Sequence, residues 1–247
     1  MIDFLPGVAV DHVLGRLAKA GGNEIKSGKF ASPESSAALA VNTFGWFIDQ
    51  PALLPPFTGL NIDLATAEVD IEYCARFPWA GGRHPWLDAV IQTPRHIVGV
   101  ESKRFEPYRD RKSVSLSPAY DRPVWGNQMT RYEAMRDALR SGEEKFELLD
   151  AAQLVKHAFG LITDAARKGK AGVLIYLFAE PPSLNGRLID SGVFVRHRAE
   201  IARFAEFVTG SAIPFHAVSY REWLSSWPAD PPAVREHAEA ILLKFDP

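Results

Sequence analysis

The sequence predicts an α/β domain, in which helices flank a central sheet. Patterns typical of helices and strands alternate along the chain. Residues 172–179 (GVLIYLFA) form a continuous apolar run of strand length, which is typical of a strand covered on both faces. A length of 247 residues suits one such domain, and a hydrophobic fraction of 47% supplies a core. We therefore expect a single domain with an N-terminal arm (1–31), a core (32–180) and a C-terminal strand with helices (181–247).

Each element has its own pattern. The arm carries a helical pattern at residues 8–20. Ser32-Pro33-Glu34 predicts the start of a helix that runs to residue 48, because Ser is a good N-cap, Pro suits the first helical position and Glu favours the positive end of the dipole. Residues 67–74 alternate like a strand, with Val69, Ile71 and Tyr73 on one face. The other expected elements are two strands within 84–103, helices at 125–140, 148–167 and 193–208, strands at 172–179 and 214–219, and terminal helices at 220–227 and 233–245.

The most informative stretch is residues 84–103 (HPWLDAVIQTPRHIVGVESK), which reads as two short apolar strands joined by a turn at 93–96. A hairpin folded about that turn places residue 90 opposite 99, and Asp88 opposite Glu101. Because side chains alternate along a strand, Lys103 lies on the same face as Glu101. Like charges opposed across a sheet are destabilising, so this arrangement predicts a divalent cation held by both carboxylates. The alternative is that Asp88 caps a turn and Glu101 pairs with Lys103 or Arg104 on a solvated edge.

Asp88 followed by Glu101-Ser102-Lys103 resembles the PD-(D/E)XK nuclease superfamily, although the Pro that usually precedes the Asp is displaced to Pro85. The order of a helix, three strands, helices and a strand over residues 32–180 also resembles that family. The resemblance implies a restriction-endonuclease-like core, namely a central mixed sheet with an antiparallel meander flanked by helices. It also implies that Asp88, Glu101 and the backbone carbonyl of Ser102 bind Mg²⁺, with Mn²⁺ as a substitute. It also implies that Lys103 orients or helps to deprotonate the attacking water and stabilises charge in the transition state.

Two further patterns extend the candidate site. Gln128 and Tyr132, four residues apart on the predicted helix 125–140, resemble the helix after the ExK strand in exonuclease domains of bacterial recombination helicase-nucleases. There the Gln and Tyr face the active site; the alternative for Tyr132 is a core aromatic. Glu34 is the candidate for an additional acidic ligand on the first helix, a role for which Glu68 and Glu72 compete.

Contacts with DNA must come from a local basic patch, because the formal net charge is only −2. The loop after Lys103 is rich in basic and aromatic residues that could follow a phosphate backbone. Its acidic residues leave an ordinary solvated loop as the alternative. The candidates for DNA binding are Arg104, Arg109, Arg111 and Lys112.

Several other classes of protein are disfavoured. The one cysteine, Cys74, excludes an intramolecular disulfide and a cysteine-based zinc site, and fits a reducing cytoplasm. No apolar run of about 18 residues predicts a membrane span, and the N-terminus does not read as a signal peptide. Neither a glycine-rich phosphate loop nor a nucleophile elbow is present.

The sequence therefore predicts a cytoplasmic, Mg²⁺-dependent nuclease, an (endo)deoxyribonuclease whose partner is DNA, with a homodimer left open. Two alternatives remain. One is a non-catalytic member of the same fold that binds nucleic acid or protein. The other is an unrelated small-molecule enzyme in which the D…ExK pattern is accidental.

Overall fold

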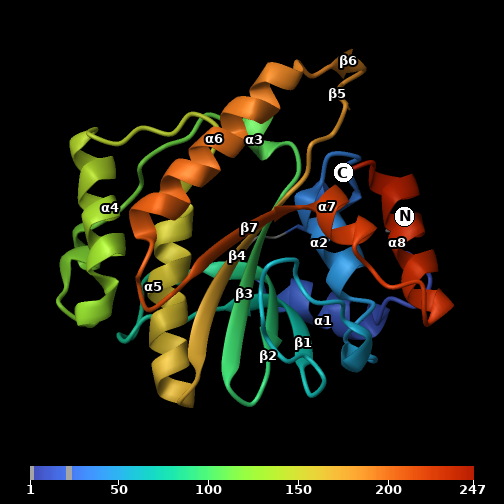
Figure 1. Cartoon of the computed structure of the whole chain (residues 1–247), viewed down its shortest axis with the longest axis horizontal. Coiled ribbons are helices and arrows are strands. Elements are labelled where there is room, and N and C mark those ends of the chain that lie inside the picture. Colours follow the sequence, from blue (N-terminus) through green and yellow to red (C-terminus); the bar gives the residue numbers. More distant parts are fainter. Residues whose placement is uncertain (1–2, 21–23) are drawn as a thin grey trace.

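A five-stranded mixed sheet forms the centre of the computed structural model, which describes residues 3–20 and 24–247 (Figure 1). The strand order is β1-β2-β3-β4-β7. β1, β2 and β3 pair antiparallel, whereas β3, β4 and β7 pair in parallel. The predicted mixed sheet with an antiparallel meander is thus confirmed. The strands are β1 (Glu68–Cys74), β2 (Trp86–Gln92), β3 (His96–Lys103), β4 (Ala171–Phe178) and β7 (Phe215–Ser219).

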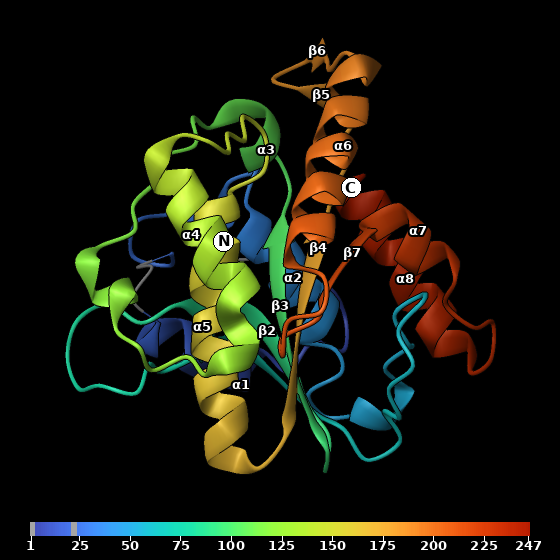
Figure 2. The same cartoon turned by 60° about the vertical axis from the view of Figure 1, so that its left-hand side comes forward.

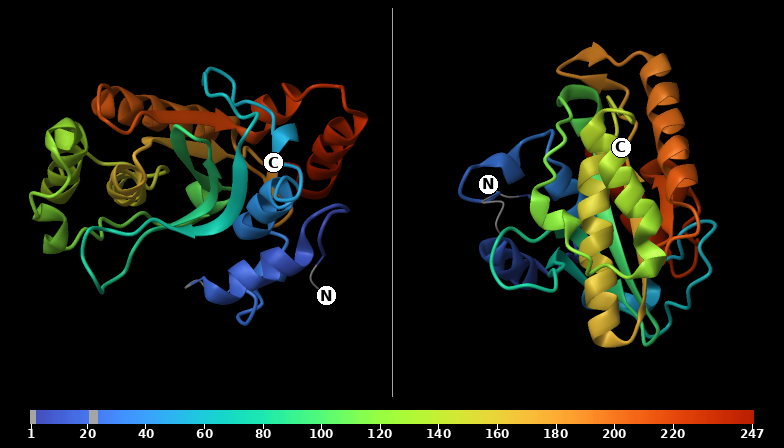
Figure 3. Two further views of the ribbon diagram at one scale, coloured as in Figure 1. Left: turned by 90° about the horizontal axis from the view of Figure 1, so that it is seen from below. Right: turned by 90° about the vertical axis from the view of Figure 1, so that its left-hand side faces the viewer.

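Helices cover both faces of the sheet, as Figures 2 and 3 show from different sides. One layer contains α1 (Val10–Lys19), α2 (Ser36–Phe44), α7 (Tyr220–Ser225) and α8 (Pro232–Phe245). The other contains α4 (Thr130–Ser141), α5 (Ala151–Lys168) and α6 (Ser191–Val208). The short helix α3 (Glu106–Arg109) follows β3, and a small hairpin of β5 (Ser183–Leu184) and β6 (Arg187–Leu188) precedes α6. None of the described helices combines the length and hydrophobicity needed to cross a bilayer.

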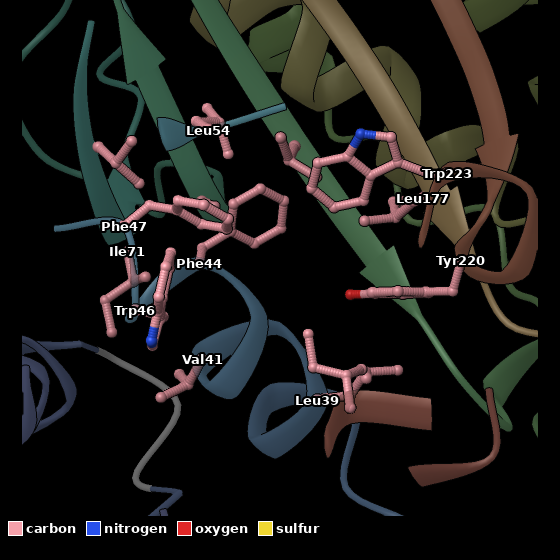
Figure 4. Packing of buried hydrophobic residues seen from close by; sticks show 14 of the residues in the cluster. Leu39, Val41, Phe44, Trp46, Phe47, Leu54, Ile71, Leu177, Tyr220 and Trp223 are labelled. Atoms are coloured by element: carbon pink, nitrogen blue, oxygen red, sulfur yellow. The ribbon is translucent and has the colours of Figure 1, made fainter. Parts of the chain in front are cut away.

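The first layer encloses an aromatic core that also supports β3 (Figure 4). Trp223 stacks on Phe44 and Phe57, with ring centroids 5.5 and 4.5 Å apart. One turn before it, the buried hydroxyl of Tyr220 lies 2.7 Å from the hydroxyl of Ser102. This hydrogen bond anchors the end of β3 to α7. The candidate motif therefore lies on a strand that is fixed from behind.

The residues expected to form an N-terminal arm pack onto the core. Val13 and Leu17 of α1 are buried against the sheet. Arg16 donates to the backbone carbonyl of Ile71 at 3.1 Å and pairs with Asp70 at 3.0 Å. Helix α1 is consequently tied to β1, beside the strand residues that approach the candidate site.

Two helices begin later than the sequence predicts. The N-cap of α2 is Ser35, whose hydroxyl accepts from the N–H of Ala38 at 3.0 Å, so Glu34 precedes the helix. Ser32 instead closes a local turn by accepting from the N–H of Glu34. The helix expected from residue 125 begins at Thr130, because Gly126 adopts a left-handed φ of 86° that a helix cannot contain.

Two glycines allow α5 to pack closely on the sheet. A Cβ atom at Gly99 of β3 would lie 2.6 Å from Leu87 and 2.9 Å from Leu161 of α5. A Cβ atom at Gly160 of α5 would lie 2.8 Å from Ala75 and from Pro85, at the two ends of the β1–β2 loop. The first turns of α5 are therefore held beside the C-terminal end of β3.

Candidate active site

The register of the β2–β3 hairpin agrees with the sequence-based prediction. Val90 pairs with Gly99 and Ala89 with Val100. One step further along, Asp88 comes opposite the Glu101–Ser102 segment, and there its side chain replaces a backbone acceptor. The N–H of Ser102 donates to Asp88 Oδ2 at 2.6 Å. Asp88 is thereby held between the two strands at the point where their regular pairing ends.

Glu101 is buried, with 2% of its surface exposed, and has a cationic or polar group at each carboxylate oxygen. Lys103 forms an ion pair with Oε1, and Nε2 of His157 lies 2.8 Å from Oε2. The geometry of the His157 contact is too poorly aligned for a regular hydrogen bond. Burial alone would raise the pKa of Glu101, but the charges of Lys103 and His157 outweigh it and lower the pKa to about 2.

The environment of Glu101 also raises the pKa values of Asp88 and Lys103. Burial, followed by the charge of Glu101, raises the pKa of Asp88 well above its usual range. Burial tends to lower the pKa of Lys103, but Glu101 and Asp88 together raise it above its usual value. The ammonium group is therefore firmly protonated, and the site still holds more negative charge than Lys103 neutralises.

A third carboxylate, Glu72 of β1, belongs to the same group. It lies opposite Asp88 in the register of β1 with β2. Its backbone φ is 47°, a left-handed conformation that is uncommon for residues other than glycine. The pleat breaks here, since Ile71 faces the core of the α2 layer whereas Tyr73 packs against the α5 layer. The expectation that Ile71 and Tyr73 share a face is therefore wrong, and backbone strain of this kind clusters at functional sites.

The environment of Glu72 is also short of positive charge. Burial, followed by the charges of Glu24 and Glu101, raises its pKa to about 7. Glu72 competed with Glu34 for the role of additional acidic ligand, and the geometry favours Glu72. Glu34 borders the same pocket, but it pairs with Arg109 at 2.6 Å and lies on the loop before α2 rather than on the helix.

These groups line one pocket of about 590 Å³ at the C-terminal end of β3. It is bounded by β1, β2 and β3, by the loop before α2, by α3 and by the first turn of α5. The charged residues that border it are Glu24, Lys29, Glu34, Glu72, Asp88, Glu101, Lys103, Glu106, Arg109 and Asp110, and the uncharged polar residues are Ser32, Ser35, Ser36 and Gln153.

The structure does not bring Gln128 and Tyr132 to this pocket. Gln128 is exposed, in the short turn before α4. Tyr132 is fully buried in the core of the α5 layer, where its hydroxyl donates to the carbonyl of Ile213 at 3.1 Å. The helix that reaches the end of β3 is α5, which places Gln153 at the pocket and His157 against Glu101. These two residues have the same four-residue spacing, which is the signal that sequence reasoning could have used.

The basic loop after Lys103 is mostly engaged in internal contacts. Arg104 is buried and donates to the carbonyls of Pro33 and Phe245, so it is a structural residue rather than a DNA contact. Arg109 pairs with Glu34 and Asp110, and Lys112 donates to the carbonyl of Glu106. Arg111 is exposed, and no ion pair of its side chain is recorded among the described residues, so it alone of the four keeps a free charge.

The donor set suits a hard cation. Mg²⁺ requires oxygen ligands and usually takes one or two carboxylates, with water and substrate phosphate completing the octahedron. Within residues 3–20 and 24–247, no group of three or more His, Cys, Asp or Glu side chains is arranged to hold a metal ion by itself. An open set of carboxylates with unusually high pKa values for Asp88 and Glu72 fits a cation that is bound partly through its substrate.

Comparison with known proteins identifies the family. Searches of curated proteins and of solved structures return no match. A family model described as Restriction Endonuclease associating with ARP matches residues 5–240, which includes every element from α1 to most of α8. With this match over nearly the whole chain, and the D…ExK hairpin in a mixed five-stranded sheet, the protein belongs to this restriction-endonuclease-like family.

Proposed function

We propose that the protein is a Mg²⁺-dependent nuclease that hydrolyses phosphodiester bonds in DNA. The observation that carries this proposal is that Glu72, Asp88 and Glu101 line one pocket together with Lys103, a partly buried ammonium group that pairs with Glu101. Crowded carboxylates of this kind gain stability from a divalent cation and a phosphate, which together neutralise the site.

Asp88 and Glu101 are the proposed metal ligands, with Glu72 as a third carboxylate near them. The backbone of Ser102 is a suitable further ligand. Its N–H points toward Asp88, and in an extended strand the carbonyl of the same residue points to the same side. Bound there, Mg²⁺ (or Mn²⁺) would polarise a phosphoryl oxygen and lower the pKa of a water molecule.

Lys103 has a role that follows from its charge. Because Glu101 and Asp88 raise its pKa, it carries a proton at neutral pH and is suited to stabilise negative charge on the scissile phosphate. The same pKa makes it a poor base. Of the roles that the resemblance implies, charge stabilisation and orientation of the water therefore have the stronger support.

Gln153 and His157 act from α5. Gln153 borders the pocket and can donate its amide hydrogens to a phosphate or a water. His157, buried against Glu101 Oε2, holds that carboxylate in one orientation. We assign it the role of a positioning residue.

A cleavage assay combined with a binding assay tests the proposal. The wild type is expected to cut DNA with Mg²⁺ or Mn²⁺, whereas Ca²⁺, which accepts looser geometry, supports binding without efficient cleavage. Glu101→Ala is expected to lose cleavage but to keep or gain DNA affinity, because a negative charge beside the phosphate is removed. Lys103→Ala is expected to lose cleavage and bind more weakly.

Glu239→Ala is the matched control, since Glu239 is exposed on α8 and pairs only with Arg235 among the described residues. It should leave both measurements unchanged. If the wild type and Glu101→Ala bind DNA equally and neither cuts it with any divalent metal, the protein is a binding member of the fold and the catalytic proposal is wrong.

A further inference from the structure

A second pocket adjoins the active-site pocket on the side of α5. It has a volume of about 460 Å³, and Trp86 and Gln153 border both pockets. Its other walls come from the β1–β2 loop, which supplies Arg83, and from α5, which supplies Lys156 and His157. Figure 2 shows this loop running past α5. We call this second pocket the side pocket.

The side pocket contains two cationic side chains, Arg83 and Lys156, for which no ion pair is recorded among the described residues. The structure records no hydrogen bond of either side chain among these residues. Arg104 and Arg109, by contrast, form hydrogen bonds or ion pairs within the protein. Asp150, which caps α5 by accepting from the N–H of Gln153 at 2.9 Å, is the one carboxylate among the described residues that line the pocket, so the two cations outnumber it. The pocket is therefore suited to an anionic ligand.

His157 adds a buried ring whose Nε2 contacts Glu101 and whose Nδ1 has no hydrogen-bond partner among the described residues. Only 2% of its surface is exposed, and neither ring nitrogen makes a well-aligned hydrogen bond with another described residue. A buried polar atom in this state is rare in a folded protein and commonly marks the position of a ligand. Because the ring borders the side pocket, a ligand there could satisfy Nδ1.

Trp86 supplies an aromatic surface. The other tryptophans of the chain each pack against another aromatic ring, for example Trp125 on Phe159 and Trp79 on Phe77. For Trp86, no aromatic partner and no hydrogen bond of the indole are recorded within the described part of the chain, and it is partly exposed at the boundary of the two pockets. A partly exposed indole beside free cations is the combination with which proteins bind unpaired nucleotides.

We propose that the side pocket binds an unpaired nucleotide next to the bond that is cut, with its phosphate held by Arg83 and Lys156 and its base stacked on Trp86. This inference builds on the proposed function and adds a substrate class, namely DNA with a single-stranded end or gap at the cleavage site. A base can stack on Trp86 only after it has left the duplex, so a fully paired strand cannot use the pocket.

The test compares two DNA ligands that share one duplex, one blunt and one with a three-nucleotide overhang. Binding is measured in Ca²⁺, so that cleavage does not interfere. The wild type should prefer the overhang, and Trp86→Leu should reduce affinity for it about five-fold or more, since stacking of one base contributes at least about 1 kcal/mol. Affinity for the blunt duplex should not change.

The salt dependence of binding gives an independent readout for the cations. Arg83→Ala and Lys156→Ala should each reduce the slope of log affinity against log salt by about 0.7, the value for one phosphate contact to a single strand. Lys156→Arg keeps the charge and should keep the slope. Arg235→Ala, which removes an exposed cation on α8, is the control and should have no effect.

The inference is overturned if the wild type binds both ligands equally, or if the three variants leave the preference and the slope unchanged. In that event cleavage by the wild type would still support the proposed function. Absence of cleavage with intact, variant-sensitive binding of the overhang would instead contradict the proposed function and support the side pocket.

Discussion

Replacing Asp88 with Asn should stabilise the metal-free protein, although Asp88 is one of the proposed metal ligands. The amide keeps an oxygen that can accept from the N–H of Ser102, but it removes a charge that faces Glu101. Two carboxylates about 5 Å apart repel by about 3 kcal/mol at an effective dielectric constant of 20. Partial protonation of Asp88 reduces this value, so we expect a gain of about 1–3 kcal/mol. For a chain of this size that corresponds to a rise in Tm of about 2–12 °C in EDTA.

Mg²⁺ should stabilise the wild type more than it stabilises Asp88→Asn. With about 10 mM Mg²⁺ and a Kd of about 1 mM, the wild type gains about 1.4 kcal/mol, or about 3–6 °C. Asp88→Asn should gain little, because a metal ligand has been weakened. Thermal unfolding with EDTA measures the effect of the substitution on stability, and thermal unfolding with Mg²⁺ measures the effect of the metal.

Glu101→Gln is the informative comparison. Because Lys103 and His157 lower the pKa of Glu101 to about 2, its charge stabilises the fold. Its removal should cost on the order of 3 kcal/mol in EDTA. Opposite signs for these two neighbouring carboxylates cannot arise from general disruption. A loss of stability for Asp88→Asn in EDTA would show that repulsion between Asp88 and Glu101 does not destabilise the metal-free protein. Equal stabilisation of the wild type and Asp88→Asn by Mg²⁺ would show that Asp88 is not a metal ligand.

Three further outcomes are expected. Gly160→Val should reduce stability by about 1–3 kcal/mol and impair cleavage, because the valine side chain forces α5 away from the β1–β2 loop. Gly15→Ala, in open space on α1, should be neutral or stabilising. Thermal unfolding and cleavage rates check both variants. Tyr132→Phe should cleave DNA at the wild-type rate, whereas Gln153→Ala should be slower in the same steady-state assay. Burial, together with nearby cations, lowers the pKa of His197 to about 3, so the folded state keeps it neutral while the unfolded chain binds a proton below about pH 6.5. His197 should therefore reduce stability by up to about 1.4 kcal/mol for each unit of pH lost between about 6.5 and 3, and His197→Gln should show a flatter dependence in denaturant unfolding at pH 4, 5 and 6.

The β2–β3 hairpin could be predicted in detail because its information is local. The turn at residues 93–96 and the apolar strands fix the pairing, and a shift of one residue would expose the buried face. The position of Asp88 relative to Glu101 and Lys103 follows from that register. The apolar run at 172–179 was equally clear, since a strand buried on both faces needs no long-range information to be recognised.

The helical part of the site could not be predicted in the same way. Which helix packs against the end of β3 depends on Gly99 and Gly160, whose importance appears only when strand and helix are in contact. The pattern of Gln128 and Tyr132 was assigned to the site because their helix comes first in the chain. The loop after β3 in fact carries α4 to the outside of α5, so the second helix takes that place.

The roles of the charged loop residues could not be predicted from the sequence either. Arg104 is drawn inside by the carbonyls of Pro33 and Phe245, which lie far from it along the chain. Glu72 was visible only as one of several acids on an alternating strand. Its left-handed backbone and its position opposite Asp88 distinguish it from Glu68 in the folded protein.

The most direct test of the proposed metal site is anomalous diffraction from a crystal soaked in Mn²⁺, because Mn²⁺ substitutes for Mg²⁺ and can be located without reference to activity. We predict a peak between the carboxylates of Asp88 and Glu101, within about 2–2.5 Å of an oxygen of each. The same soak of Glu101→Ala crystals should lose the peak. A wild-type crystal with no peak there, at a Mn²⁺ concentration that supports DNA cleavage in solution, would contradict the assignment of this pocket as the metal-dependent active site.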